Sequence, residues 1–213
     1  MIDQRIKDFI VDIADQIPEK PDYWSSCGQC DSNIDRAEDL KEILKRDRMN
    51  YKYTSTKEWV DAFPCAYRQW KADTHCNQIH GYAFSIRLFF GCNTLDARNW
   101  CADYGGMKDL KEILQNQFDH TLLVAEDDPH IDLYEEMEMR GIAKLTRLPR
   151  VGCEGLADMI YKYVNAVYIP DHWGKGESDR IWCYRVEVRE TQSNMAFREG
   201  HREWNEDLFD DGV

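Results

Sequence analysis

Two short segments of the chain combine residue types that can move protons. Cys76 precedes His80 by four positions, at the predicted start of a strand. A thiol becomes a proton-abstracting thiolate where nearby positive charge lowers its pKa, and an imidazole changes charge near neutral pH. Asp119 adjoins His120, and a carboxylate beside an imidazole can tune its protonation state. Each segment also has an ordinary structural interpretation, a buried thiol in the first and a helix-terminal histidine in the second.

Glu190 is a candidate for binding rather than for proton transfer. By strict alternation it falls on the same strand face as Tyr184 and Val188. A carboxylate on an apolar face requires a hydrogen-bond donor. A pterin or purine-like ring supplies one, because its ring N–H and exocyclic amine lie side by side and match the two carboxylate oxygens. The alternatives are an arginine of the chain, such as Arg185, Arg189 or Arg198, and water at the strand end.

Composition narrows the class of protein. The 213 residues carry a formal net charge of −13, which opposes broad binding to nucleic acid or anionic membranes. No apolar run approaches the roughly 18 residues of a membrane-spanning helix, and no signal-peptide pattern opens the sequence. A cytoplasmic protein with eight reduced cysteines is therefore expected. Cys27 and Cys30 have the spacing of half a zinc site, but no second pair follows, so two free loop thiols are the favoured interpretation.

The chain divides into three parts. Apolar residues at helical spacing predict two amphipathic helices in residues 1–58, which form an N-terminal helical extension. Residues 59–200 form an α+β domain, in which alternating residues predict strands and helical spacing predicts helices. The predicted strands cover 59–69, 80–90 and 181–190, and the predicted helices cover 107–114 and 154–164. An acidic tail, residues 201–213, follows the domain.

In their order along the chain, these segments resemble the family that includes 6-pyruvoyltetrahydropterin synthase and 6-carboxytetrahydropterin synthase. Five short stretches between Phe63 and Glu199 are each similar to a family motif. They are Cys76-x-x-x-His80-Gly81, Asp103-Tyr104-x-x-Met107-Lys108, Asp119-His120, Cys153-Glu154-x-Leu156-Ala157 and Val188-Arg189-Glu190-Thr191. Any one of them alone is common, but all of them in the family's order make the resemblance specific.

The resemblance implies a fold and a set of roles. The fold is the tunnelling fold, an antiparallel sheet with two helices on one face that joins with other copies into an oligomeric barrel. Cys76 is implied as the proton-abstracting thiolate, Asp119 and His120 as its relay, and Glu190 as the anchor of the pterin. Active sites of the family borrow residues from neighbouring subunits, so a homo-oligomer with a shared pocket, a trimer or a hexamer, is expected.

Two positions depart from the family pattern. The family holds catalytic zinc with three histidines, and Tyr67 and Tyr82 stand here at two of those positions. A neutral phenol is a poor zinc ligand, because its reference pKa is about 10. Tyr67 and Tyr82 are therefore expected to contact the substrate. Any zinc would need a displaced set of ligands built from His80, His75 and Cys65.

The activity implied by the resemblance is conversion of 7,8-dihydroneopterin triphosphate to 6-carboxytetrahydropterin, a lyase reaction of the queuosine and 7-deazaguanine pathway. One alternative is 6-pyruvoyltetrahydropterin synthase, which uses the same scaffold and eliminates triphosphate without carbon–carbon cleavage. The other is a non-catalytic pterin- or purine-binding protein that has lost its zinc, against which the presence of Cys76, Asp119 and His120 argues. The sequence does not separate the two synthases.

Overall fold

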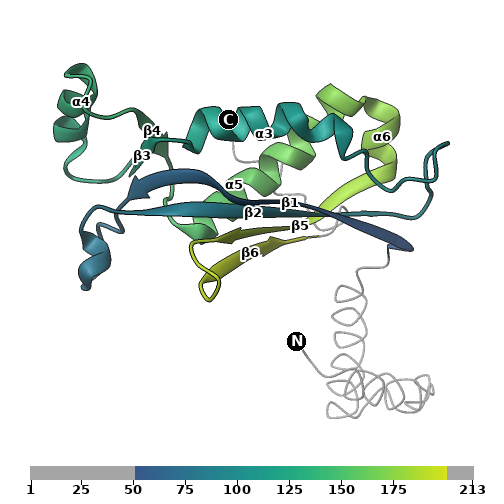
Figure 1. Ribbon diagram of the computed structural model, residues 1–213, viewed down its shortest axis with the longest axis horizontal. Helices are drawn as coiled ribbons and strands as arrows, with labels where there is room; N and C mark the ends of the chain where they lie inside the picture. The colour runs from purple at the N-terminus through teal and green to yellow at the C-terminus, as the bar shows by residue number, and fades with distance from the viewer. Residues whose placement is uncertain (1–50, 201–213) are drawn as a thin grey trace, which may run out of the picture. The chain divides into compact units, whose positions relative to one another are not determined.

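The computed structural model describes residues 51–200. Their centre is a six-stranded sheet in the order β4-β3-β1-β2-β5-β6 (Figure 1). Four strands pair antiparallel, namely β1 (Tyr53–Tyr67), β2 (His80–Cys92), β5 (Ile181–Arg189) and β6 (Met195–Glu199). Two further strands, β3 (Thr121–Ala125) and β4 (Leu145–Leu148), extend the sheet beside β1 in parallel pairing. The sheet as a whole is therefore mixed.

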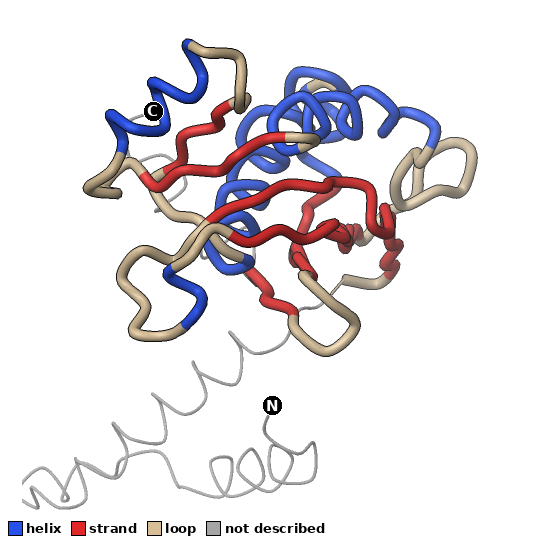
Figure 2. The backbone as a smooth tube through the Cα atoms, turned by 60° about the vertical axis from the view of Figure 1, so that its left-hand side comes forward, coloured by secondary structure: helices blue, strands red, loops and turns tan. Residues whose placement is uncertain are grey.

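Helices cover one face of this sheet, as Figure 1 shows for α3 (Lys108–Phe118) and α5 (Cys153–Tyr163). A π-helical segment, η4 (Val164–Trp173), continues α5 and leads into α6 (Lys175–Arg180). Between β3 and β4 the chain forms α4 (Ile131–Met139). Two short 3-10 turns are η2 (His75–Asn77) and η3 (Gly105–Met107). The strands curl along the sheet, with α3 and α5 gathered on one side of it (Figure 2).

The main core lies between the sheet and these helices. On α3 the buried residues Leu110, Leu114 and Phe118 recur every four positions, because this spacing puts them on one side of a helix. On β2 the buried residues include Ile86 and Leu88, which alternation turns toward the same core. The predicted arrangement, an antiparallel set of strands with two helices on one face, is confirmed.

The β3–α4–β4 segment is one part of the fold that the sequence did not predict, and α6 and β6 are others. Every residue of β3, from Thr121 to Ala125, is buried. A strand buried on both faces lacks the alternation of polar and apolar residues that reveals a strand in a sequence. The segment has a small apolar cluster of its own, in which Leu122 and Val124 pack with Tyr134 of α4.

A bulge in β5 changes the predicted alternation. Cys183 pairs with Phe90 and Arg185 pairs with Phe89, so Tyr184 is an extra residue between them. The Tyr184 ring lies beside Phe89, at 6.1 Å between ring centroids, on the face away from the core. The prediction that strict alternation places Tyr184 on the face of Glu190 is therefore wrong.

The start of the first strand also differs from the prediction. β1 begins at Tyr53, which pairs with Cys92 at the end of β2, so the strand starts earlier than the predicted Trp59. The predicted helices of the extension, the Cys27–Cys30 pair and the acidic tail lie outside the described residues. Within residues 51–200, none of the helices is long and apolar enough to span a membrane.

Candidate active site

The candidate residues gather where strands end and one helix begins. Tyr67 is the last residue of β1, and His80, the first residue of β2, lies opposite it in the antiparallel register. Tyr82 follows two positions later, on the same face of β2 as His80. Glu190 directly follows β5, and Cys153 is the first residue of α5. The site is thus assembled from segments that are far apart in the sequence.

The central interaction is a hydrogen bond from the Tyr67 hydroxyl to Oε1 of Glu190. Tyr67 is buried, with 2% of its surface exposed, and Glu190 is half-buried. Burial, followed by the hydrogen bond to Glu190 and its negative charge, raises the pKa of Tyr67 well above the ordinary value near 10. Tyr67 is therefore a neutral donor. An ionised carboxylate can accept about four hydrogen bonds, so Glu190 keeps acceptor capacity for a ligand.

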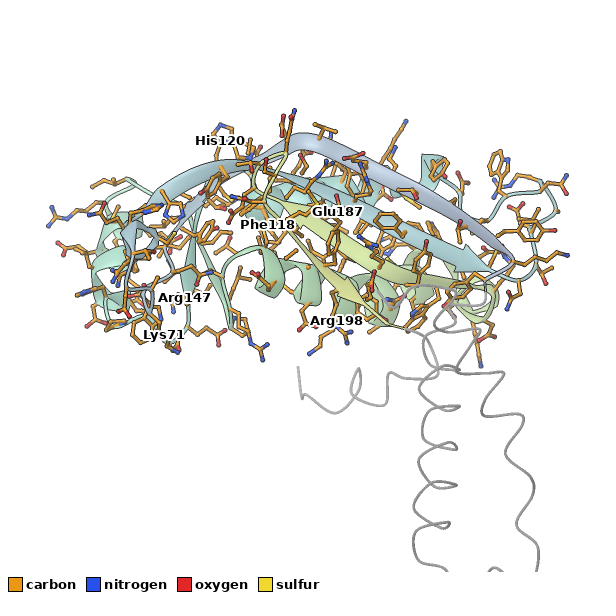
Figure 3. All side chains as sticks on the ribbon, turned by 90° about the horizontal axis from the view of Figure 1, so that it is seen from below. Lys71, Phe118, His120, Arg147, Glu187 and Arg198 are labelled. Carbon is orange, nitrogen blue, oxygen red and sulfur yellow. The ribbon has the colours of Figure 1, made fainter. Side chains whose placement is uncertain are left out.

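The arginines considered as partners of Glu190 pair with other carboxylates. The ion pairs are Arg185–Glu199 at 3.0 Å, Arg189–Glu187 at 3.1 Å and Arg198–Asp158 at 2.9 Å. Glu187 belongs to the face of the sheet away from the helices, and Figure 3, seen from that side, shows it in the middle of the sheet. Within residues 51–200, the Glu190 side chain therefore accepts a hydrogen bond from a phenol rather than from a guanidinium.

Aromatic rings form one wall of the site. The ring centroid of Tyr67 lies 5.0 Å from that of His80 and 5.8 Å from that of Phe84. His80 meets Tyr82 edge to face at 5.4 Å. Nδ1 of His80 lies 2.7 Å from the carbonyl oxygen of Gln78, which can only accept, so Nδ1 carries the proton and Nε2 is the acceptor nitrogen. Such rings give a flat conjugated ligand apolar surface to pack against.

Cys153 is a site residue whose role the sequence did not reveal. It is buried, and burial, together with the negative charges of Glu190 and Glu154, raises its pKa to about 12. The thiol is therefore neutral near pH 7 and is no nucleophile. The sequence offered one signal for Cys153, its position in the motif Cys153-Glu154-x-Leu156-Ala157 at a helix start. That motif indicated the family but did not indicate that Cys153 lies near Glu190.

The turn that carries Cys76 lies beside the aromatic wall. The Cys76 N–H lies 3.4 Å from Oγ1 of Thr74, and its carbonyl oxygen accepts the N–H of Gln69 at 2.8 Å. The side chain is half-buried. Burial and the charge of Glu190 raise the pKa of Tyr82, and Cys76 is near enough to contribute to the same effect. The structure thus places the predicted thiol near Tyr82, whose pKa the charge of Glu190 also raises.

The Asp119–His120 pair is formed as predicted but stands apart from the other site residues. Oδ1 of Asp119 lies 2.6 Å from Nδ1 of His120. The backbone of His120 is left-handed, with φ at +55°, and its N–H donates to the carbonyl oxygen of Pro64. The His120 side chain is 83% exposed and projects at the edge of the molecule (Figure 3). Within residues 51–200, no hydrogen bond or ion pair joins the pair to Cys76 or Glu190.

Comparison with known protein families decides the assignment. The model of the family described as 6-pyruvoyl tetrahydropterin synthase matches residues 56–201, which is more than half of the chain. The chain belongs to the 6-pyruvoyl tetrahydropterin synthase family. No protein with a curated description matches it in a sequence search.

Solved structures agree with the family at the level of the fold. An uncharacterized protein from Wolinella succinogenes is similar with a TM-score of 0.58 and 15% identity, over 70% of this chain and 98% of that chain. The 6-pyruvoyl tetrahydropterin synthase of Plasmodium falciparum is similar with a TM-score of 0.50 and 15% identity, over 71% of this chain and 99% of that chain. At this identity the likeness shows the fold alone, and the predicted tunnelling fold is confirmed.

The zinc implied by the 6-pyruvoyl tetrahydropterin synthase family does not fit the donors of this chain. Of the three positions expected to hold it, only His80 has an imidazole, and burial raises the pKa of both Tyr67 and Tyr82, which disfavours phenolate ligands. In the described part of the chain, the His, Cys, Asp and Glu side chains form no group of three that could hold a metal. The displaced set of His80, His75 and Cys65 is therefore not a group of ligands that the described residues bring together.

Proposed function

We propose that this protein is an enzyme of the 6-carboxytetrahydropterin synthase type, acting on 7,8-dihydroneopterin triphosphate. The observation that carries the proposal is Glu190, a half-buried carboxylate that the Tyr67 hydroxyl holds beside an aromatic wall. Such a carboxylate accepts the ring N–H and the exocyclic amine of a pterin, while the rings pack against the ligand. A purine-like ring offers the same donor edge, so it belongs to the same ligand class.

In this proposal Cys76 and Tyr82 act on the substrate side chain. Cys76, as a thiolate, takes a proton from the first side-chain carbon. One water is consumed, the two outer carbons leave as acetaldehyde, the triphosphate group leaves with its oxygen, and the first carbon remains as the carboxylate of 6-carboxytetrahydropterin. Tyr67 has one hydroxyl proton and uses it in the hydrogen bond to Glu190. Tyr82 is therefore the phenol that remains to donate a hydrogen bond to oxygens of the substrate side chain. Donors aimed at an oxygen that gains negative charge stabilise the transition state. The proposal involves no step through zinc, because the donors do not fit it.

The relay in this proposal comes from a neighbouring copy. The side chains of Asp119 and His120 are hydrogen-bonded to one another, and that of His120 is exposed. Within residues 51–200, neither side chain forms a hydrogen bond or ion pair with Cys76 or Glu190. His120 bonds through its backbone to Pro64, roughly 10 Å along β1 from the end that carries the site. A homo-oligomer, a trimer or a hexamer, would bring the pair of one copy to the Cys76 of the next.

Mixing two inactive variants tests the shared site. Cys76→Ala and His120→Ala should each abolish turnover as pure oligomers. When the two are unfolded and refolded together in equal amounts, about a quarter of the shared sites combine an intact Cys76 with an intact His120, so about a quarter of wild-type turnover should return. No recovery in mixed oligomers, confirmed as mixed by native mass spectrometry, would contradict a shared site.

Product analysis tests the reaction. Incubation with 7,8-dihydroneopterin triphosphate, followed by mass spectrometry, should yield 6-carboxytetrahydropterin and acetaldehyde. A yield of 6-pyruvoyltetrahydropterin instead would assign the other synthase, and tight pterin binding without turnover would indicate a binding protein. Cys76→Ala should abolish turnover and keep neopterin affinity, while Asp73→Asn, an exposed change near the same turn, should keep both. If the product is 6-carboxytetrahydropterin, we assign the protein a cytoplasmic role in queuosine and 7-deazaguanine biosynthesis.

A further inference from the structure

Arg68 and Asp128 form a buried ion pair next to the turn that carries Cys76. Nε of Arg68 donates to Oδ2 of Asp128 at 2.9 Å, and Nη2 donates to Oδ1 at 2.8 Å. The Asp128 side chain is 2% exposed and that of Arg68 is 16% exposed. Burial acts to raise the pKa of Asp128, but hydrogen bonds from Arg68 and from the His130 amide outweigh it and lower the pKa. Asp128 is therefore a charged carboxylate with its partners in place.

The third nitrogen of the Arg68 guanidinium, Nη1, contacts the turn that carries Cys76. Nη1 donates to Oδ1 of Asn77 at 3.2 Å and lies 3.4 Å from its carbonyl oxygen. Asn77 directly follows Cys76, and the carbonyl oxygen of Cys76 accepts the N–H of Gln69. Two consecutive residues, Arg68 and Gln69, thus hold the turn at the carbonyl group of Cys76 and at the residue that follows it. Both come immediately after Tyr67, so the turn is fixed relative to the residue that holds Glu190.

The two hydrogen bonds between Arg68 and Asp128 determine the direction of the third nitrogen, Nη1. A guanidinium is planar, and two parallel hydrogen bonds to one carboxylate fix its plane. Once Nε and Nη2 are bound to Asp128, the direction of Nη1 is fixed as well, and it is directed at Asn77. An arginine without this carboxylate could adopt other rotamers and release the turn.

We propose that Asp128 is a positioning residue that acts through Arg68 and Asn77 to fix the turn of Cys76 beside Tyr82. This role rests on the proposed function, in which the thiol of Cys76 must meet the substrate side chain. Asp128 lies in the connection between β3 and α4, so the inserted β3–α4–β4 segment supplies the anchor of the active-site turn. It touches no reacting atom itself.

The neighbouring carboxylate, Asp127, provides a matched comparison, because its ion pair with Lys71 is exposed and does not contact Cys76 or Asn77. Asp127 accepts hydrogen bonds from Nε1 of Trp70 and from Lys71, which belong to the same β1–β2 connection as Cys76. Its side chain is 54% exposed, and its partners precede the Cys76 turn. Asp127→Asn therefore removes a charge from the same loop contact, one residue away, and leaves Arg68 bound to Asp128.

The experiment compares Asp128→Asn and Asn77→Ala with Asp127→Asn in the full chain. Each variant is assayed for turnover of 7,8-dihydroneopterin triphosphate, for neopterin affinity, and for the rate at which iodoacetamide alkylates Cys76, followed on its peptide by mass spectrometry. Because misplacing a reacting group by about 1 Å can cost on the order of 100-fold, Asp128→Asn should lower kcat roughly 10- to 100-fold. Neopterin affinity should stay within about two-fold, since Glu190 is untouched, and alkylation should become at least about three-fold faster as the turn loosens.

Each outcome decides the proposal. Turnover and alkylation rates in Asp128→Asn equal to those of Asp127→Asn would overturn it. If Asp128→Asn does not fold, Asn77→Ala decides, because it removes a contact of the turn and leaves the buried pair intact; unchanged kcat and alkylation there would also overturn it. If the wild-type protein turns over no pterin triphosphate, the proposed function fails, but the alkylation rates still show whether Asp128 fixes the turn.

Discussion

Replacing Glu190 by glutamine tests the pterin assignment at the level of single atoms. The Tyr67 hydroxyl donates to Oε1 of Glu190, and in a glutamine only the amide oxygen can accept that bond. Tyr67 should therefore orient the amide with its oxygen toward the phenol and its NH₂ group toward the ligand. That NH₂ group would face the donor edge of the pterin, where the carboxylate accepts hydrogen bonds.

The size of the effect follows from the lost acceptor. A hydrogen bond to a charged group contributes about 1.5–3 kcal/mol, and at least one pterin N–H loses its acceptor in Glu190→Gln. Glu190 is half-buried, so water can offset part of the loss and the lower half of this range applies. Since each 1.4 kcal/mol is a factor of ten, neopterin should bind roughly 10- to 40-fold more weakly.

Titration of neopterin, followed by its fluorescence, measures this change. Glu112→Gln is the matched control, because Glu112 is exposed on α3, and it should leave the affinity unchanged. Adding Tyr67→Phe to Glu190→Gln frees the introduced amide to turn its oxygen to the ligand, so the double variant should bind no more weakly than Glu190→Gln alone. Unchanged affinity in Glu190→Gln would refute Glu190 as the pterin anchor, and a further loss in the double variant would refute the orienting role of Tyr67.

Four other measurements follow from the structure. Elemental analysis should find less than one zinc per chain, and dialysis against a chelator should leave turnover unchanged; stoichiometric zinc that disappears in His80→Ala would contradict this. Iodoacetamide at pH 8 should modify Cys76 of the folded protein and spare Cys65 and Cys153, whose pKa burial raises to about 12, so equal rates would show that the pocket is not closed around them. The lowered pKa of Asp128 means that its carboxylate stabilises the fold above the unfolded value near 3.9 and loses this effect as the pH falls through the folded value. In urea titrations the free energy of unfolding of wild type and Asp128→Asn should differ most near neutral pH, whereas a difference that does not change with pH would exclude a charge effect. Light scattering should find a trimer or hexamer at micromolar concentration, and a stable 25.2 kDa species would contradict the oligomer.

The strands β1, β2 and β5 and the two main helices could be predicted because their apolar residues recur at the spacing of a strand or helix face, whereas β6 was not predicted. Alternation identified β2, and the four-residue spacing of Leu110, Leu114 and Phe118 agrees with a helix that packs on a sheet. β3 could not be found in this way, because all its residues from Thr121 to Ala125 are buried. Tyr184 was placed on the wrong face because a bulge changes the phase of alternation without any glycine or proline to mark it.

Site residues that belong to short sequence motifs could be predicted. Site residues that are defined by contacts between distant parts of the chain could not. Glu190 was found as a carboxylate that needs a donor, but nothing in the sequence indicated that the donor is Tyr67. The Arg68–Asp128 pair joins residues 60 positions apart, and Asp128 belongs to no motif that the sequence offered. Charged residues are usually exposed, so a buried carboxylate becomes visible only when its burial is known.

The bond between Tyr67 and Glu190 also has a consequence for how the protein is made. It joins positions 123 residues apart, and contacts of such span come at a high cost in loop-closure entropy. During synthesis, which proceeds from the N-terminus, Cys76 and His80 leave the ribosome long before β5 does. A nascent chain can therefore hold all its acid–base groups and still be unable to bind a pterin. Pterin added during refolding should bind only molecules that have reached the folded state. It should therefore lower the rate of unfolding without raising the rate of folding.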